Sequence, residues 1–188
     1  QSTADSSTDA GASAAAAMTT AAEDATSKGI KCGGNLTMSG GSCTIDSTDH
    51  AVHAAGTAVF SGTTLEITSD NKGISSHGDL EISGGDITIH SCTEGVESKA
   101  EMTISGGNVR ILDASDDGLN TGGSDSGSYA MTITGGTLLA LSSKGMMEYP
   151  ESGCLIATNC NAAAGEQISI VDKNGTVLAT LQSPKAVS

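Results

Sequence analysis

The chain has 188 residues, and its 22 acidic and 8 basic side chains give a formal net charge of −14 at pH 7. This charge argues against nucleic-acid binding, which needs basic contacts to phosphate, and no apolar run approaches the ~20 residues of a membrane-spanning helix. The 25 Gly and the absence of Trp disfavour both long helices and an aromatic platform for stacking on sugars. The composition therefore predicts many turns and a core of aliphatic side chains.

The N-terminal segment, residues 1–26, is rich in Ala, Ser and Thr. Its Ala-rich part is open to three interpretations: a helix, a cap or a linker. We favour a linker or an N-terminal cap, because an uncapped stack of strands exposes backbone edges and core. This segment is therefore predicted to be separate from the repeats that follow it.

An apolar residue that follows a turn recurs at nearly constant spacing along the next part of the chain. It occurs at Ile30, Val52, Ile74, Val96, Leu119 and Met146, so its sequence number increases in steps of 22, 22, 22, 23 and 27. A Ser-Gly step recurs independently at Ser39, Ser61, Ser83 and Ser105, with the same increment of 22 each time. Two landmarks with one period indicate an internal repeat over residues 27–148.

Each repeat contains two segments in which apolar and polar residues alternate, as between Leu80 and Ile89. Alternation with a period of two predicts strands that bury one face. With a third short strand around the Ile30-type position, each repeat supplies three strands and three turns. The predicted fold class is all-β: a single-stranded parallel β-helix, or solenoid, with coils of about 22 residues and aliphatic ladders inside.

The regular repeat stops after Met146, and residues 149–188 are predicted to form a C-terminal capping segment. Within it, residues 166–182 contain two alternating stretches on either side of Lys173-Asn174-Gly175. A turn of this composition between such stretches predicts a β-hairpin cap.

Oxygen-bearing side chains gather at one corner of the fourth and fifth repeats. The predicted stacking brings together Glu94, Glu97, Asp116, Asp117 and Asn120. Carboxylates this close repel one another unless a cation lies between them. Ca²⁺ binds oxygen at ~2.3–2.6 Å, and twice that length is near the ~4.8 Å between strands, so one ion can bridge two coils. We expect a calcium site; a solvated acidic turn with Lys72 paired to Glu94 is the alternative.

Three further residues beside this corner are candidate ligand-binding residues: Lys72, Lys99 and Asp125. Asp125 belongs to an insertion after Leu119, and insertions in solenoids form loops on one face that is often functional. A polysaccharide lyase would need calcium and a basic side chain near it, for which Lys72 and Lys99 are the candidates. Both lysines can equally be partners of the neighbouring glutamates.

The histidines do not by themselves indicate a metal site or a catalytic group. His50 and His53 fall on one corner of the second repeat, but no third ligand for a transition metal is evident there. No Ser-His-Asp order and no nucleotide-binding loop emerges from the stacked columns. We therefore expect surface histidines and predict no catalytic residue.

A resemblance to a known family rests on four successive segments: SKGIKCGGNLTMSGG, DNKGISSHGDLEISGGDITI, TEGVESKAEMTISGG and DDGLNTGGSDSG. They resemble secreted bacterial proteins that contain a carbohydrate-binding domain. The resemblance implies a right-handed parallel β-helix related to pectate-lyase-like folds, binding of plant cell-wall polysaccharides including uronate-containing ones, and bound calcium without established catalysis. The EGxE motif falls on Glu94 and Glu97, and the DDGLN motif falls on Asp116, Asp117 and Asn120. Where the family has an acidic pair on the second coil, this chain has Asp49-His50.

Taken together, we expect a bacterial, secreted or cell-surface module that is monomeric and binds an acidic or plant cell-wall polysaccharide with the aid of calcium. Neither nucleic acid nor a membrane span is expected. Two alternatives are a calcium-dependent, pectate-type lyase and a structural stalk or adhesin segment in which calcium serves rigidity alone.

Overall fold

The computed structural model of the chain describes residues 27–122, 129–143, 150–153 and 160–187. These residues form strands and no helix, and so they contain no helix long and apolar enough to cross a membrane. The predicted linker or cap, residues 1–26, and the candidate residue Asp125 lie outside the described residues.

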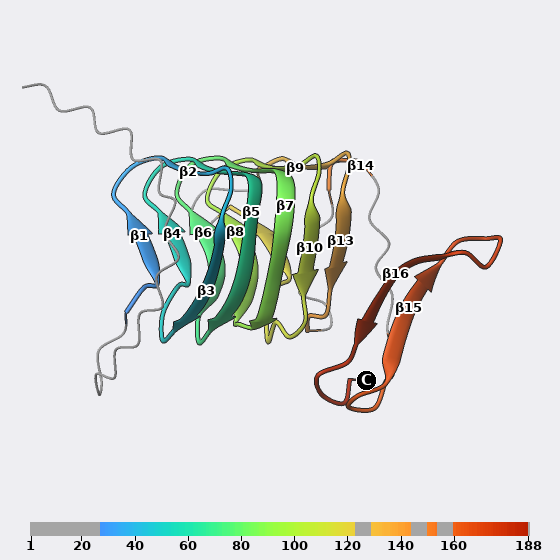
Figure 1. Cartoon of the computed structure of the whole chain (residues 1–188). Helices are drawn as coiled ribbons and strands as arrows, with labels where there is room; N and C mark the ends of the chain where they lie inside the picture. Colours follow the sequence, from blue (N-terminus) through green and yellow to red (C-terminus); the bar gives the residue numbers. More distant parts are fainter. Residues whose placement is uncertain (1–26, 123–128, 144–149, 154–159, 188) are drawn as a thin grey trace, which may run out of the picture.

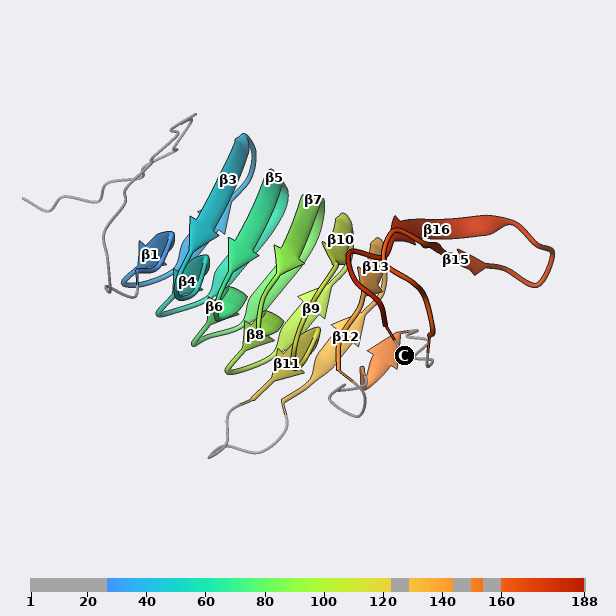
Figure 2. The same ribbon diagram turned by 90° about the horizontal axis from the view of Figure 1, so that it is seen from below.

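Two parallel sheets run along a stack of coils (Figure 1). The smaller sheet has five described strands, in the order β1 (Ile30–Cys32), β4 (Val52–Ala54), β6 (Lys72–Ser76), β8 (Glu94–Ser98) and β11 (Leu119–Thr121). The larger sheet has nine described strands: β2 (Leu36–Met38), β3 (Ser42–Ser47), β5 (Ala58–Ser69), β7 (Leu80–Ser91), β9 (Met102–Ile104), β10 (Asn108–Ile111), β12 (Met131–Ile133), β13 (Thr137–Ala140) and β14 (Ser152–Gly153). Figure 2 shows successive coils passing through the smaller sheet and then through the larger one.

Neighbouring coils are in parallel register at the spacing that the sequence repeat predicts. Ile30 pairs with Val52, and Ile74 pairs with Val96, so each apolar residue lies beside its own equivalent in the following repeat. Val96 then pairs with Leu119 on the next coil. The prediction of an all-β solenoid with coils of about 22 residues is confirmed.

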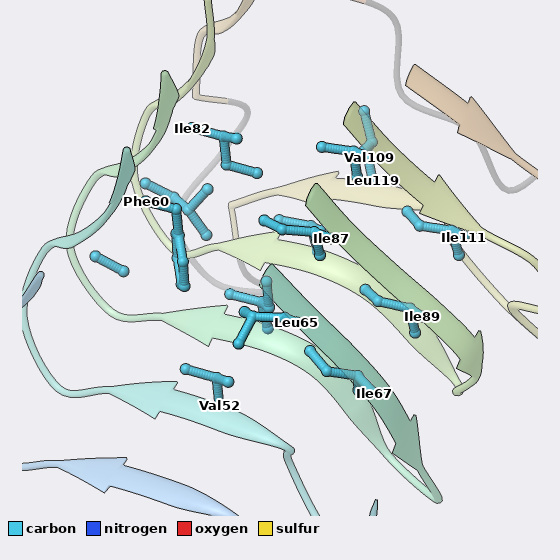
Figure 3. Close-up of a cluster of buried hydrophobic side chains, with 14 of the residues drawn as sticks. Val52, Phe60, Leu65, Ile67, Ile82, Ile87, Ile89, Val109, Ile111 and Leu119 are labelled. Carbon is cyan, nitrogen blue, oxygen red and sulfur yellow. The ribbon is translucent and has the colours of Figure 1, made fainter. Parts of the chain in front are cut away.

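The interior is filled by stacked aliphatic side chains (Figure 3). Leu65, Ile87 and Val109 form one such ladder through the register of β5, β7 and β10, and all three are buried. Phe60 is the one aromatic ring in the described core. Full burial of an aliphatic side chain of this size stabilises the fold by ~1.5–3 kcal/mol, so regular stacking builds a core with few aromatic residues.

A glycine lies one residue before the apolar residue of the smaller sheet in every described coil but the second, where Ala51 precedes Val52. A Cβ on Gly73 would lie 2.6 Å from the carbonyl oxygen of Gly95 and 2.6 Å from Cδ1 of Ile89. A Cβ on Gly95 would meet the carbonyl oxygen of Gly118 and lie 2.6 Å from Cδ1 of Ile111. The close approach of adjacent coils therefore requires glycine at these positions.

The predicted hairpin is present, as β15 (Gln167–Val171) paired antiparallel with β16 (Val177–Gln182). At its turn, the carboxylate of Asp172 accepts hydrogen bonds from the backbone N–H groups of Asn174 and Thr176, both at 2.8 Å. The hairpin lies beyond β13, at the C-terminal end of the stack of coils (Figures 1 and 2). Lys185, beyond the hairpin, contacts Asp113 of the solenoid at 2.6 Å. The boundaries 27–148 and 149–188, and the capping role, stay predictions.

Candidate functional site

A row of polar side chains runs along the outer face of the smaller sheet. Because side chains alternate along a strand, the residues that follow the buried Val52, Ile74 and Val96 point outward. Parallel pairing aligns these outward residues into what we call the central row: Lys31, His53, Ser75, Glu97 and Asn120.

Two flanking rows border the central row. One lies three residues before it and contains Lys28, His50, Lys72, Glu94 and Asp117; the other lies two residues after it and includes His77 and Lys99. Flanking side chains cover the middle of the central row, where Ser75 and Glu97 are each 1% exposed and His53 is 8% exposed. We call the three rows together the polar face.

Glu97 is a buried carboxylate held by three side chains. Lys72 and Lys99 each donate from Nζ to Oε1 of Glu97, and Ser75 donates from Oγ to Oε2 at 2.9 Å. Burial alone would raise the pKa of Glu97, but the hydrogen bonds from the two lysines bring it below its usual value. Burial would lower the pKa of Lys72, but its contact with Glu97 raises it overall. Both groups are therefore charged at neutral pH.

Glu94 lies beside this cluster on the same strand, β8. Its Oε2 accepts hydrogen bonds from Nζ of Lys72 at 3.1 Å and from Nδ2 of Asn120 at 3.2 Å. Lys72 thus bridges Glu94 and Glu97. Its contact with Glu94 is the ion pair expected under the alternative interpretation, in which this corner binds no metal ion. Three of the predicted calcium ligands, Glu94, Glu97 and Asn120, are brought together around one lysine.

Asp116 and Asp117 adjoin this cluster through their backbone. The N–H of Asp116 donates to the carbonyl of Thr93, and the N–H of Gly95 donates to the carbonyl of Asp117, both at 2.9 Å. Asp117 is buried and Asp116 is half-buried. The two aspartates therefore lie on the coil next to Glu94, in the column that the repeat predicts.

A calcium ion bound by Glu97 does not fit this arrangement. The two oxygens of Glu97 are taken by two ammonium groups and a hydroxyl, so a cation there would have to displace Lys72 and Lys99. Among the described residues, no group of three or more His, Cys, Asp or Glu side chains could hold a metal ion. The lysines supply the positive charge that the crowded carboxylates require. The calcium site predicted at Glu94, Glu97, Asp116, Asp117 and Asn120 stays a prediction.

A row of three histidines occupies the other end of the polar face. The ring of His53 lies edge-on to His50, with centroids 5.3 Å apart, and edge-on to His77, with centroids 5.0 Å apart. The expectation of surface histidines is wrong for His53, because the flanking rows cover it. The sequence predicts His50 and His53 on one corner, but His77 was missed. His77 and Lys99 each follow a buried apolar residue by three positions, and this recurrence is the signal that could have identified it.

Asp49 anchors this histidine row. Its carboxylate contacts Nζ of Lys28 and Nδ1 of His50, both at 2.5 Å, and accepts a hydrogen bond from Nδ2 of Asn71 at 3.0 Å. The hydrogen bond from Lys28 holds the pKa of Asp49 well below its usual range. Because both oxygens of Asp49 are engaged, its charge is compensated by groups within the fold.

The polar face concentrates the cationic side chains of an acidic protein. Of the 8 basic residues, four lie on it: Lys28, Lys31, Lys72 and Lys99. Of the 4 histidines, three lie on it: His50, His53 and His77. His90 is instead on the outer face of the larger sheet, where Nε2 contacts Glu66 at 2.6 Å. Four lysines and the three carboxylates of Glu94, Glu97 and Asp117 lie on the polar face, so this face does not share the strong negative charge of the chain as a whole, which is −14.

Comparison with known proteins gives one family. The family model described as "carbohydrate-binding domain-containing protein" matches residues 2–71 and 59–177 of the chain, which together span both sheets and the beginning of the C-terminal hairpin. Neither the curated proteins nor the solved structures contain a match to the chain.

Proposed function

Because this chain belongs to the carbohydrate-binding domain-containing protein family, we propose that it is a non-catalytic module that binds a polysaccharide along the polar face. The observation that carries this placement is the alignment of polar side chains from successive coils on the smaller sheet. Its exposed members Lys31 and His77 and the half-buried Lys99 can be reached by a ligand, although the middle of the central row is covered. Successive members of the row lie one strand spacing, ~4.8 Å, apart. A linear polymer with polar groups on each sugar can contact several coils at once.

The polar face favours recognition through hydrogen bonds and charge. Phe60 is buried in the core and cannot provide a stacking surface. Lys31 and His77 are exposed, and Lys99 has 37% of its side chain exposed. Ammonium and imidazole groups donate to sugar hydroxyls and bind carboxylates more strongly, through charge-assisted hydrogen bonds. Plant cell-wall or other acidic polysaccharides are therefore the proposed ligands, in an extracellular setting, as the resemblance of the repeat motifs to secreted proteins implies.

A binding role is favoured over lyase chemistry by the state of the lysines. A lyase base must accept a proton near neutral pH. The pKa of Lys72 is raised, because the pull of Glu97 outweighs burial, so Lys72 stays protonated. Lys99 is bound to the same carboxylate. Neither candidate base is free to remove a proton in this arrangement.

The test is retention on a panel of polysaccharides. Affinity electrophoresis through gels that contain polygalacturonate, xylan or a soluble cellulose derivative would slow the migration of the protein if one of them binds. The matched variants are Lys99→Gln on the polar face and Arg110→Gln on the outer face of the larger sheet. We expect Lys99→Gln to weaken retention and Arg110→Gln to leave it unchanged. Equal retention of both variants would place the ligand elsewhere, and no retention of the wild-type protein on any polysaccharide would contradict the proposed function.

Two control measurements separate the other candidate functions. Incubation with polygalacturonate and calcium, followed by ultraviolet absorption, detects the unsaturated product of a lyase; we expect none. Repeating the retention assay with a chelator tests the predicted calcium dependence. If a chelator lowers the melting temperature but no polysaccharide is ever retained, a structural stalk becomes the better description.

A further inference from the structure

The polar face divides into two halves of unlike charge along the axis of the solenoid. The half at β8 and β11 carries three carboxylates, those of Glu94, Glu97 and Asp117, together with Lys99, which is paired to Glu97. The other half, which we call the imidazole half, consists of Lys28, Lys31, His50, His53 and His77. Asp49 is the carboxylate that contacts the imidazole half, and Lys28 and His50 already occupy its two oxygens. Binding of a polysaccharide through hydrogen bonds needs only a row of polar side chains. It does not explain why the two halves of the polar face differ in charge.

His53 is the centre of the imidazole half and has an unpaired ring nitrogen. It is 8% exposed, and its Nδ1 is buried without a hydrogen-bond partner. A buried polar atom left unpaired costs about 1–3 kcal/mol. An unpaired buried polar atom in a folded protein needs an explanation. One explanation is that a bound ligand supplies the missing hydrogen-bond partner.

The surroundings of His53 hold donors and no available carboxylate. Lys28 and Lys31 from the first coil, His50 ahead of β4 and His77 from the third coil face it. Asp49 and Lys72 act on its neighbour His50. Lysine ammonium groups can only donate hydrogen bonds, and Lys72 is committed to Glu94 and Glu97. If His53 gains a proton, the balancing negative charge must come from a ligand.

The ligand has access from the exposed rim of the imidazole half. Lys31 and His77 are exposed, and the side chains of Lys28 and His50 are 21% and 15% exposed. Two exposed donors therefore flank the more deeply placed His53. The edge-on packing of the three rings allows a charge on the outer ring to be felt by its neighbour about 5 Å away.

We propose that the imidazole half is a subsite for an anionic group of an acidic polysaccharide, and that the histidines bind this group more tightly when they are protonated. The proposal rests on the proposed function, since it assumes a polysaccharide on the polar face. Lys31 and His77 contact the anion directly, and His50 and His53 add positive charge behind them. Carboxylate and sulfate groups share the required chemistry, and the experiment distinguishes them.

The direction of the pH dependence follows from the state of the free protein. Burial lowers the pKa of His53, and the nearby Lys28 lowers it further. Burial lowers the pKa of His50 as well, in spite of its contact with Asp49. The rings of His50 and His53 are thus mostly neutral at pH 7 in the free protein. A bound anion stabilises the protonated rings, so binding takes up protons and tightens as the pH falls.

The experiment measures the affinity of the full chain by isothermal titration at constant ionic strength, because salt screens such contacts. The probes are oligogalacturonate, a sulfated dextran and neutral xylo-oligosaccharide, each at pH values between about 8 and about 5. For the anionic probe that fits, we expect the affinity to rise about tenfold over this range, as expected for one added charge-assisted contact. Neutral xylo-oligosaccharide should show no such rise.

Matched variants assign the effect to residues. His77→Gln and Lys31→Gln should each weaken binding of the anionic probe about tenfold, and His53→Gln should flatten the pH dependence. His90→Gln, which removes an exposed histidine from the opposite sheet, should change neither. Circular dichroism of each variant confirms that the fold is kept.

The outcomes separate this proposal from the proposed function. Binding of neutral probes alone, or of anionic probes with affinity independent of pH and of His77, would overturn the anionic subsite and leave polysaccharide binding standing. Failure of the wild-type protein to bind any probe would contradict both the anionic subsite and the proposed function. A response to sulfated dextran but not to oligogalacturonate would identify the anion as sulfate.

Discussion

The ammonium of Lys72 on β6 lies against the buried carboxylate of Glu97 on β8, one coil further along the solenoid. The same ammonium reaches Glu94 at 3.1 Å, so one lysine ties two carboxylates of the next coil. Lys99 completes the neutralisation of Glu97 from the opposite flank. This ion cluster joins the third and fourth coils of the polar face, and it fixes side chains on either side of the central row.

Removal of the charge at Glu97 should destabilise the protein. Glu97→Gln leaves two ammonium groups around a buried, neutral side chain, and breaking one member of a buried ion pair costs about 3–5 kcal/mol. Urea unfolding followed by circular dichroism measures the loss. Glu81→Gln, at an exposed position of β7, is the control and should cost less than about 0.5 kcal/mol. Equal stability of the two variants would mean that the Lys72–Glu97–Lys99 cluster does not form.

The glycines of the smaller sheet give a second prediction about stability. Gly95→Ala places a Cβ against the backbone of Gly118 and the side chain of Ile111, and such overpacking costs about 1–3 kcal/mol or more. Gly33→Ala is the matched control, because a Cβ there meets nothing within 4 Å. Thermal unfolding should show a lower melting temperature for Gly95→Ala only. A Gly95→Ala protein as stable as the control would contradict the close contact between these coils.

The stability of the polar face should decrease with acid. Folding lowers the pKa of His50 and His53 by burial, and it lowers the pKa of Asp49 through the hydrogen bond from Lys28. In each case the unfolded state binds more protons than the native state, so the free energy of unfolding falls as pH falls. The histidine contribution should be lost below about pH 6.5 and the carboxylate contribution below about pH 4.

Urea unfolding at a series of pH values measures this dependence. His53→Gln should flatten the decrease between about pH 6.5 and about pH 5, because it removes a buried titrating group. A wild-type protein whose stability rises on acidification through this window would show that these histidines are protonated in the native state.

Calcium binding is predicted for the aspartates of the fifth coil. Double replacement of Asp116 and Asp117 by Asn removes two charged oxygen ligands and should weaken calcium affinity at least about tenfold. Isothermal titration with calcium chloride measures the change. Glu97→Gln should leave calcium affinity nearly unchanged, since its carboxylate is held by lysines. Unchanged affinity in the double variant would mean that any calcium site lies elsewhere.

The fold could be predicted well because one physical pattern is repeated. The register of Ile30, Val52, Ile74, Val96 and Leu119 follows from residue spacing alone, since an alternating strand that stacks on its own copy has only one way to bury its apolar face. The hairpin at residues 166–182 was likewise evident from its turn and its flanking alternation.

The site could be predicted only in part, because its chemistry depends on the reach of long side chains. The sequence placed Glu94, Glu97 and Asn120 at one corner, and hydrogen bonds link these residues through Lys72. It could not decide whether a metal ion or a lysine neutralises the carboxylates, since Lys72 must extend across to the next coil to do so. His77 was missed because it lies just after a short strand. It contacts His53 of the preceding coil only because the two coils are stacked.

The most direct test of the account follows the four histidine rings by NMR while a polysaccharide oligomer is added. His50, His53 and His77 report on the polar face, and His90 reports on the opposite sheet within the same molecule. Single His→Gln variants assign the signals. On addition of oligogalacturonate at about pH 6, we predict shifts of the His50, His53 and His77 signals and no change at His90. Binding of the oligomer with all three of these signals unchanged would contradict the assignment of the polar face as the carbohydrate-binding surface.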